Sequence, residues 1–125
     1  MNLLLLPDTF AICRLAGDDP IPPWAAGNFV SITRTSDELS IVCSRAQVPD
    51  DVKAERGWRC LRVTGTLEFT EVGVLSALAG PLADAEISIF VVSTFDTDYL
   101  VVREADLERA VVVLCGAGHE VVTHG

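Results

Sequence analysis

The order of extended and helical patterns after Trp58 is the feature that most constrains the fold of this chain. Some segments alternate between apolar and polar residues, others have apolar residues at helical spacing, and others are apolar throughout. Turn-forming residues separate these segments. The pattern predicts strand 58–64, helix 71–82, strands 87–92 and 99–102, helix 104–115 and strand 119–123. With right-handed crossovers, this βαββαβ order gives an antiparallel sheet with both helices on one face, the ferredoxin-like arrangement.

The first predicted helix has a recognisable start and end. Thr70 can cap a helix that begins at Glu71. Its apolar residues form one stripe of the kind that covers a core: Val72, Leu75, Leu78, Ala79 and Leu82. We expect Gly80 and Pro81 to interrupt the last turn, because proline has no N–H and its ring crowds the preceding turn.

The first half of the chain combines short extended segments with a proline-rich loop. Strands are predicted over 2–6, 9–15, 29–33 and 39–43, and a second loop or short helix over 47–56. The segment Gly17–Pro23 reads Gly-Asp-Asp-Pro-Ile-Pro-Pro, which neither a helix interior nor a central strand accommodates. Trp24 follows this loop, and its ring is expected to cover the core.

The two halves share one layout. Residues 29–33 align with 89–93 and residues 38–42 with 98–102, an offset of 60. In both, an apolar strand leads into a Ser/Thr-rich turn and a second strand follows. The repetition predicts an α+β protein of two ferredoxin-like units, an N-terminal unit over 1–57 and a C-terminal domain over 58–125. Because the Gly17–Pro23 loop stands where the first helix would be, the first unit is expected to be reduced or rearranged.

Composition excludes several classes of function. The net charge is -9, and an acidic surface repels phosphate backbones and anionic lipid, so neither nucleic acid nor a membrane surface is an expected partner. Met1–Leu6 is apolar, but it lacks a basic flank and runs into Pro7, so it is interpreted as a strand and not as a signal segment. No other apolar run has the length of a membrane span. A cytoplasmic protein is expected.

The cysteines and histidines do not indicate a metal, a cofactor or a catalytic site. The cysteines are widely spaced with no CxxC pair, so reduced thiols are expected. His119 and His124 lie near the C-terminal end without a cysteine pair, so the spacing of a zinc site is missing. No nucleophile with a base is apparent either, and His119 is more simply a residue at the start of a strand. The prediction is therefore a protein that is not an enzyme.

A specific pattern appears in the second half. It consists of Glu71-Val72-Gly73-Val74-Leu75, then Ala79-Gly80-Pro81-Leu82, Ile87-Ser88-Ile89-Phe90 and Ser93-Thr94-Phe95-Asp96-Thr97-Asp98 before Tyr99-Leu100-Val101-Val102. In this order of helix start, Gly-Pro break and polar turn, the chain resembles the ACT domain family. It is most similar to the ACT-type domains of cytosolic arginine sensors and of small bacterial tandem-ACT proteins. The resemblance is strongest from Trp58 onward.

The resemblance implies a regulatory protein that senses an amino acid. In the arginine sensors the ligand lies between two ACT units and touches the start of the first helix and the polar turn between the strands. Carried over residue by residue, those contacts correspond to Glu71, Val72, Gly73, Glu86, Thr94, Phe95 and Asp98. A homodimer and a regulated protein partner are also implied.

The chemistry of these residues suits a zwitterion or a cation. N–H groups at the helix start near Gly73 can hold a carboxylate, and glycine permits close approach. The carboxylates of Glu71 and Asp98 can hold an ammonium or a guanidinium group. Each residue also has a structural interpretation, because Glu71 favours the helix dipole and Asp98 can close a turn by local hydrogen bonds. Val72 and Phe95 are core or wall residues under either interpretation.

A ligand-free alternative follows from the same residues. ACT-like units often pair side by side, so the chain could be a dimerisation or interaction module without any ligand. A cavity lined by polar groups at the helix start and the 94–98 turn would favour sensing, and a site filled by side chains would favour the module.

Overall fold

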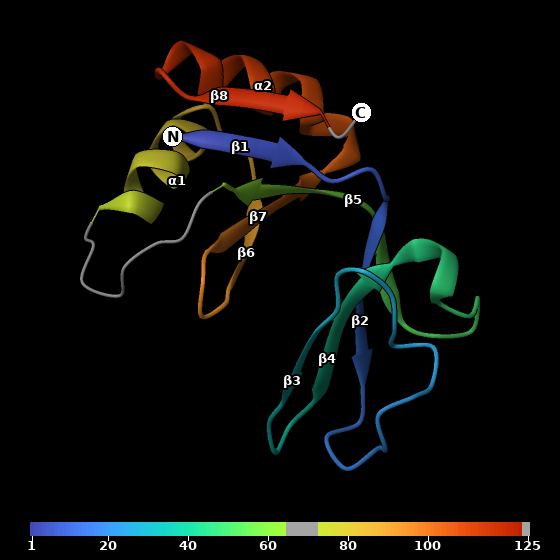
Figure 1. Cartoon of the computed structure of the whole chain (residues 1–125). Coiled ribbons are helices and arrows are strands. Elements are labelled where there is room, and N and C mark those ends of the chain that lie inside the picture. The colour runs from blue at the N-terminus through green and yellow to red at the C-terminus, as the bar shows by residue number, and fades with distance from the viewer. Residues whose placement is uncertain (65–72, 124–125) are drawn as a thin grey trace. The chain divides into compact units, whose positions relative to one another are not determined.

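The computed structural model describes residues 1–64 and 73–123. Figure 1 shows the course of the chain. The strands are β1 (Asn2–Leu5), β2 (Phe10–Leu15), β3 (Ser31–Arg34), β4 (Leu39–Ser44), β5 (Ala54–Val63), β6 (Ile89–Ser93), β7 (Asp98–Arg103) and β8 (Glu120–Thr123). The helices are α1 (Val74–Asp84) and α2 (Leu107–Gly116), with short 3-10 turns η1 (Arg45–Gln47) and η2 (Glu104–Asp106). The predicted α+β class is confirmed.

The chain divides into two compact units. The N-terminal unit is Asp8–Trp58, and the C-terminal unit combines Met1–Pro7 with Arg59–Gly125. Strand β5 therefore gives its first half to one unit and its second half to the other. The prediction grouped residues 1–57 together. In the structure β1 belongs instead with the C-terminal unit, because Leu3 is buried in the core of that unit.

In the C-terminal unit the strands follow the order β6-β7-β5-β1-β8. The βαββαβ order by itself would set β8 beside β5. Strand β1 lies between them, antiparallel to β5 with Leu3 opposite Val63. It is parallel to β8, with Leu3 opposite Val121. The unit is thus a ferredoxin-like sheet widened by one strand from the start of the chain.

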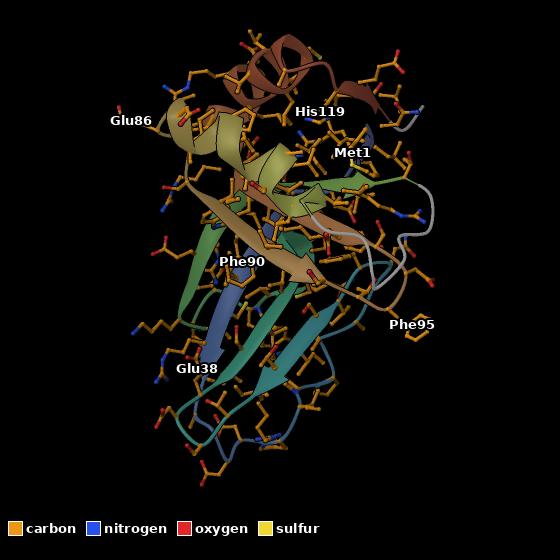
Figure 2. All side chains as sticks on the ribbon, turned by 90° about the vertical axis from the view of Figure 1, so that its left-hand side faces the viewer. Met1, Glu38, Glu86, Phe90, Phe95 and His119 are labelled. Atoms are coloured by element: carbon orange, nitrogen blue, oxygen red, sulfur yellow. The ribbon has the colours of Figure 1, made fainter. Side chains whose placement is uncertain are left out.

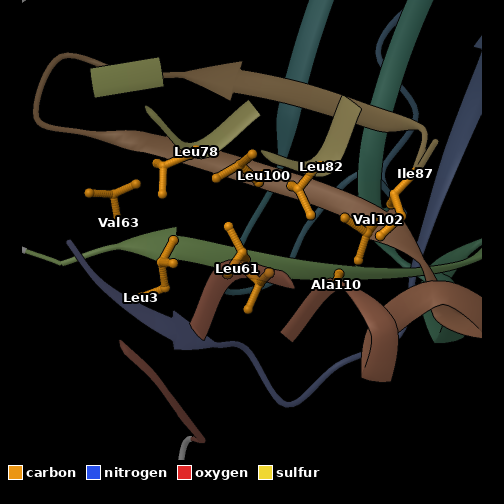
Figure 3. Close-up of a cluster of buried hydrophobic side chains, with 10 residues drawn as sticks. Leu3, Leu61, Val63, Leu78, Leu82, Ile87, Leu100, Val102 and Ala110 are labelled. Carbon is orange, nitrogen blue, oxygen red and sulfur yellow. The ribbon is translucent and has the colours of Figure 1, made fainter. Parts of the chain in front are cut away.

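Both helices of this unit cover the same face of its sheet. The strand residues of its core cluster alternate along β5 and β7, as expected for side chains on one face of a sheet. The cluster comprises Leu3, Leu61, Val63, Leu78, Leu82, Ile87, Leu100, Val102, Ala110 and Leu114. Figure 3 shows how Leu78 and Leu82 of α1 and Ala110 of α2 meet the strand residues. The predicted helical stripe is confirmed for Leu78 and Leu82, whereas Leu75 is 37% exposed.

The N-terminal unit has the ferredoxin-like strand order too, but it lacks both the inserted strand and the helices. Its strands follow β3-β4-β2-β5, and a second core lies on one face of this sheet. The core includes Cys13, Ile41 and Cys43, and Trp24 packs against it from the loop. Trp24 thus covers the core, as predicted. Val48 and Val52, from the segment before β5, also pack in this core. Loops therefore stand where a ferredoxin-like unit carries helices, and this unit is the reduced copy.

The structure corrects the offset of the repeat from 60 to 59. Strand β4 with η1 covers Leu39–Gln47, and β7 with η2 covers Asp98–Asp106, so equivalent elements start and end 59 residues apart. At this offset the buried Ile41 and Leu100 correspond, whereas an offset of 60 would match residues on opposite faces. The alignment of the two halves at an offset of 60 is therefore wrong by one residue. Apolar residues run continuously in these strands, so the sequence does not show which side chains alternate between the two faces of the sheet.

Helix α1 differs from its prediction at both ends. It begins at Val74 and not at Glu71, because Gly73 has φ 79°, outside the right-handed helical region. Thr70, Glu71 and Val72 lie outside the described residues. The predicted interruption at Gly80 and Pro81 is wrong, since the helix continues through Pro81 to Asp84. The segment predicted as a loop or short helix over 47–56 also ends earlier, because β5 begins at Ala54.

Three of the four cysteines are buried, and the fourth, Cys115, is exposed on α2. Burial raises the pKa of Cys60 to about 12. Burial, with a smaller contribution from Cys43, raises the pKa of Cys13 to about 11 despite the opposing charge of Arg56. Because the thiolate is the reactive form, these thiols are inert in the folded protein.

We therefore expect a chromogenic thiol reagent at neutral pH to react rapidly with Cys115 alone in the native protein and with every cysteine after unfolding. The rapid native reaction should disappear in Cys115→Ser. Rapid labelling of that variant would contradict the buried positions of the other three cysteines.

Candidate functional site

The turn between β6 and β7 is held by hydrogen bonds within residues 94–97. The Thr94 N–H donates to the Thr97 carbonyl at 2.8 Å. The Thr94 hydroxyl also lies 3.1 Å from that carbonyl and accepts from the Thr97 N–H at 3.3 Å. Strand register pairs Ser93 with Asp98 at the base of the turn. The turn therefore has a fixed shape that does not depend on a ligand.

Thr97 attaches this turn to the end of β5. Its side chain is 3% exposed, and its hydroxyl donates to the Val63 carbonyl at 2.8 Å. Val63 is the last residue of β5, from which the chain leads toward α1. The bond therefore brings the polar turn to the end of the sheet where the first helix follows.

The first turn of α1 presents backbone donors, and its N-cap residue has no side chain that could cap them. Gly73 is the N-cap residue and gives no capping hydrogen bond. Its carbonyl accepts the first intrahelical bond from the Ala77 N–H at 2.9 Å. The N–H groups of the first turn, from Val74 to Ser76, have no acceptor within the helix by geometry. They form a positive end that suits a carboxylate.

The charge near the turn is negative. The Asp98 carboxylate accepts a hydrogen bond from the Ser93 hydroxyl at 2.6 Å. It has no ion-pair partner in the described part of the chain, and Asp96 stands exposed in the same turn. In sequence, the connecting segment 65–72 carries Glu68 and Glu71 and no Lys or Arg. An ammonium or guanidinium group would therefore find unbalanced carboxylates here.

The structure brings together some of the predicted site residues and separates one of them. Thr94, Phe95 and Asp98 share the turn, and Gly73 starts the helix that follows β5. Phe95 is 77% exposed at the tip of the hairpin (Figure 2). Glu86 lies beyond the other end of α1, an 11-residue helix about 16 Å long. Figure 2 shows Glu86 and Phe95 on opposite sides of the unit.

Two residues that matter to the turn were not among the predicted contacts. Ser93 holds the Asp98 carboxylate, and Thr97 attaches the turn to β5. A signal for the turn was present in the repeat, because Thr35 and Glu38 make the same pattern in the other hairpin. There the Thr35 hydroxyl accepts from the Glu38 N–H at 3.1 Å, and the Thr35 N–H donates to the Glu38 carbonyl at 2.9 Å.

The matching turn of the N-terminal unit is covered by its own chain. The Arg34 guanidinium donates to the Gly17 carbonyl, and the Arg14 guanidinium donates to the Asp37 carbonyl at 3.0 Å. A Cβ atom at Gly17 would lie 2.8 Å from the Ser36 carbonyl oxygen, so the proline-rich loop lies directly against the turn. The turn of the C-terminal unit has no such loop against it among the described residues and is attached instead to the end of β5 through Thr97.

Solved structures show the same fold. A protein from Agrobacterium tumefaciens is 45% identical, with a TM-score of 0.94 over 99% of this chain and 93% of that one. The regulatory subunit of aspartate kinase from Thermus thermophilus is 9% identical, with a TM-score of 0.60 over 88% of this chain and 93% of that one. The second likeness concerns the fold alone.

Among curated proteins, the human cytosolic arginine sensor for mTORC1 subunit 1 is 41% identical over 58 residues, which are 46% of this chain. The match spans only 18% of the sensor's length. The names of these two proteins describe a sensor and a regulatory subunit, and not a catalytic domain. None of the described helices is both long and apolar enough to cross a membrane.

Two family models match successive parts of the chain. One, described only as an N-terminal domain, matches residues 8–51. The other is the ACT domain and matches residues 53–116, which is more than half of the chain. The βαββαβ order of the C-terminal unit and its polar turn agree with that match. The chain belongs to the ACT domain family.

Proposed function

We propose that this protein is an amino-acid-binding regulatory protein whose ligand lies at the polar turn 94–98 and the first turn of α1. The observation that carries the proposal is the buried hydrogen bond from Thr97 to the Val63 carbonyl, which sets the turn at the end of β5 that leads to the helix. The 41% identity over 58 residues with an arginine sensor supports the same class of ligand, and the match to the ACT domain, over residues 53–116, includes this region.

The two halves of an amino acid match the two sides of this site. The N–H groups of the first helical turn after Gly73 suit the α-carboxylate. The Asp98 carboxylate, already oriented by Ser93, keeps acceptor sites for an ammonium or guanidinium group. Glu71 and Val72 are proposed to complete the contacts from the segment before the helix, and Thr94 and Phe95 to border them. Contact with Glu86 is not included, because that residue lies at the far end of α1.

The mode of action we propose is regulation without catalysis. A ligand that binds one arrangement of subunits more tightly shifts the population toward it and so changes affinity for a protein partner. A homodimer in the cytoplasm is the expected form of the protein. That the ligand also touches a second ACT unit stays a prediction.

Binding can be tested with purified protein and the full set of common amino acids. A ligand that binds only the native state stabilises it by RT ln(1 + L/Kd), where L is the free ligand concentration, so the melting temperature rises with the logarithm of that concentration once it exceeds Kd. We expect one amino acid to give such a concentration-dependent shift, with the dissociation constant then measured by calorimetry. Asp98→Asn should weaken binding about tenfold or more, because it removes a charge-assisted contact.

Asp37→Asn is the matched control, since Asp37 stands in the equivalent turn of the N-terminal unit. It should leave the affinity unchanged. No shift with any amino acid at millimolar concentration would contradict the proposal and favour the ligand-free dimerisation module. Equal weakening by both substitutions would also count against a site at the 94–98 turn.

A further inference from the structure

Helix α1 contains a backbone acceptor that the helix itself cannot satisfy. In a regular α-helix the Ala77 carbonyl would accept from the N–H of residue 81. Residue 81 is a proline and has no N–H, yet the helix continues to Asp84. The imidazole of His119 supplies the missing donor, with its Nε2 3.1 Å from the Ala77 carbonyl oxygen.

The surroundings of His119 fix the role of each ring nitrogen. A carbonyl oxygen can only accept, so Nε2 carries the hydrogen in the neutral ring. The other nitrogen, Nδ1, lies 3.0 Å from the Met1 amino group and acts as the acceptor. Figure 2 shows His119 and Met1 next to each other beside α1. One side chain thus connects α1 with the start of β1.

The backbone of His119 is held as firmly as its ring. Its N–H donates to the Leu114 carbonyl of α2 at 3.0 Å. The next N–H, that of Glu120, donates to the Met1 carbonyl at 3.0 Å, at the start of the parallel pairing of β1 and β8. The donor to Ala77 is therefore placed by α2, β1 and β8 together.

A short path of hydrogen bonds joins His119 to the candidate site. The His119 ring donates to the Ala77 carbonyl, and the N–H of the same Ala77 donates to the Gly73 carbonyl at 2.9 Å. Gly73 is the N-cap residue of the turn proposed to hold the ligand's carboxylate. We infer that His119 is a positioning residue, which fixes the first turn of α1 for ligand binding. The inference rests on the proposed amino-acid site.

The inference can be tested by a double-mutant cycle between His119 and Pro81. His119→Ala removes the donor, and we expect about a fivefold loss of affinity for the amino acid identified in the screen, the size of one hydrogen bond. His119→Gln keeps an N–H donor near the Nε2 position and should restore most of the affinity. Pro81→Ala returns an N–H to the helix, so His119→Ala should cost little in that background.

A readout independent of ligand accompanies the cycle. Amide hydrogen exchange at Ala77 should be about fivefold faster in His119→Ala, because the first turn opens more often, and unchanged in the double variant. The melting temperature of each variant shows that it is folded under the conditions used.

The outcomes separate this inference from the function on which it rests. If wild-type protein binds no amino acid, the proposed function fails, and faster exchange at Ala77 still decides whether His119 fixes the turn. Normal affinity and exchange in His119→Ala would overturn the inference. Equal losses with and without Pro81 would also overturn it, since the effect would then not pass through the Ala77 carbonyl.

Discussion

Replacing Leu61 with alanine is expected to lower the free energy of unfolding by about 2–5 kcal/mol, the range for a large aliphatic side chain removed from a packed core. Leu61 is fully buried in the second half of β5. In Figure 3 it stands at the centre of the cluster formed with Leu100 and Leu82. The substitution leaves a cavity between the sheet and the helices. The helices cannot move in to fill it without losing their other contacts with the sheet. Urea unfolding followed by circular dichroism measures the loss.

Val112→Ala is the matched control for this prediction. Val112 is 70% exposed on α2, so its truncation removes little apolar surface from the core and alanine favours the helix. We expect a change within about 0.5 kcal/mol. A Leu61→Ala protein as stable as Val112→Ala would show that the described core of the C-terminal unit is wrong.

Thr97→Val is expected to destabilise the protein by about 1–3 kcal/mol while keeping the shape of the side chain. The valine cannot donate to the Val63 carbonyl, which the threonine hydroxyl now meets at 2.8 Å in a buried position. An unpaired buried acceptor costs more than the bond itself contributes. Because the same bond holds the turn at the end of β5, ligand affinity should fall together with stability. Thermal unfolding and calorimetry measure the two effects.

The same substitution at Thr123 separates the hydrogen bond from the change of side chain. Thr123 ends the exposed strand β8, so valine there should change stability by no more than about 0.5 kcal/mol. If Thr97→Val and Thr123→Val are equally stable, the bond to Val63 does not hold the turn. A loss of stability in Thr97→Val without any loss of affinity would show that the turn does not contribute to ligand binding.

Local sequence patterns were sufficient to predict most elements. The hairpin of β6 and β7 was predicted because two apolar runs flank a turn of short polar residues. The apolar spacing predicted α2 within a few residues, and the proline-rich loop correctly excluded a helix from the N-terminal unit. These features depend on residues that are close in sequence. They can therefore be recognised from the local residue types and from the spacing of apolar residues.

Features that depend on distant partners could not be predicted in this way. Strand β1 pairs with β5 and β8, where Leu3 lies opposite Val63 and Val121. The sequence Asn2–Leu5 contains no signal that identifies these distant strands as its partners. The Ala77 carbonyl, which Pro81 leaves without its helical donor, meets the ring of His119, a residue more than forty positions further along the chain. At the candidate site the turn was predicted, but its attachment by Thr97 was not, because a buried hydroxyl and an exposed one look alike in sequence.

The insertion of β1 between β5 and β8 has a consequence for the way the protein is made. On the ribosome β1 emerges before either of its partners: β5 follows after the other strands of the N-terminal unit, and β8 follows β5, both helices and the hairpin of β6 and β7. Until then its apolar residues Leu3–Leu5 have no sheet to join, and the C-terminal unit cannot close. The N-terminal unit, whose strands are contiguous in the chain, can form earlier. We expect a nascent chain stalled before residue 120 to carry a folded N-terminal unit and an incomplete C-terminal sheet.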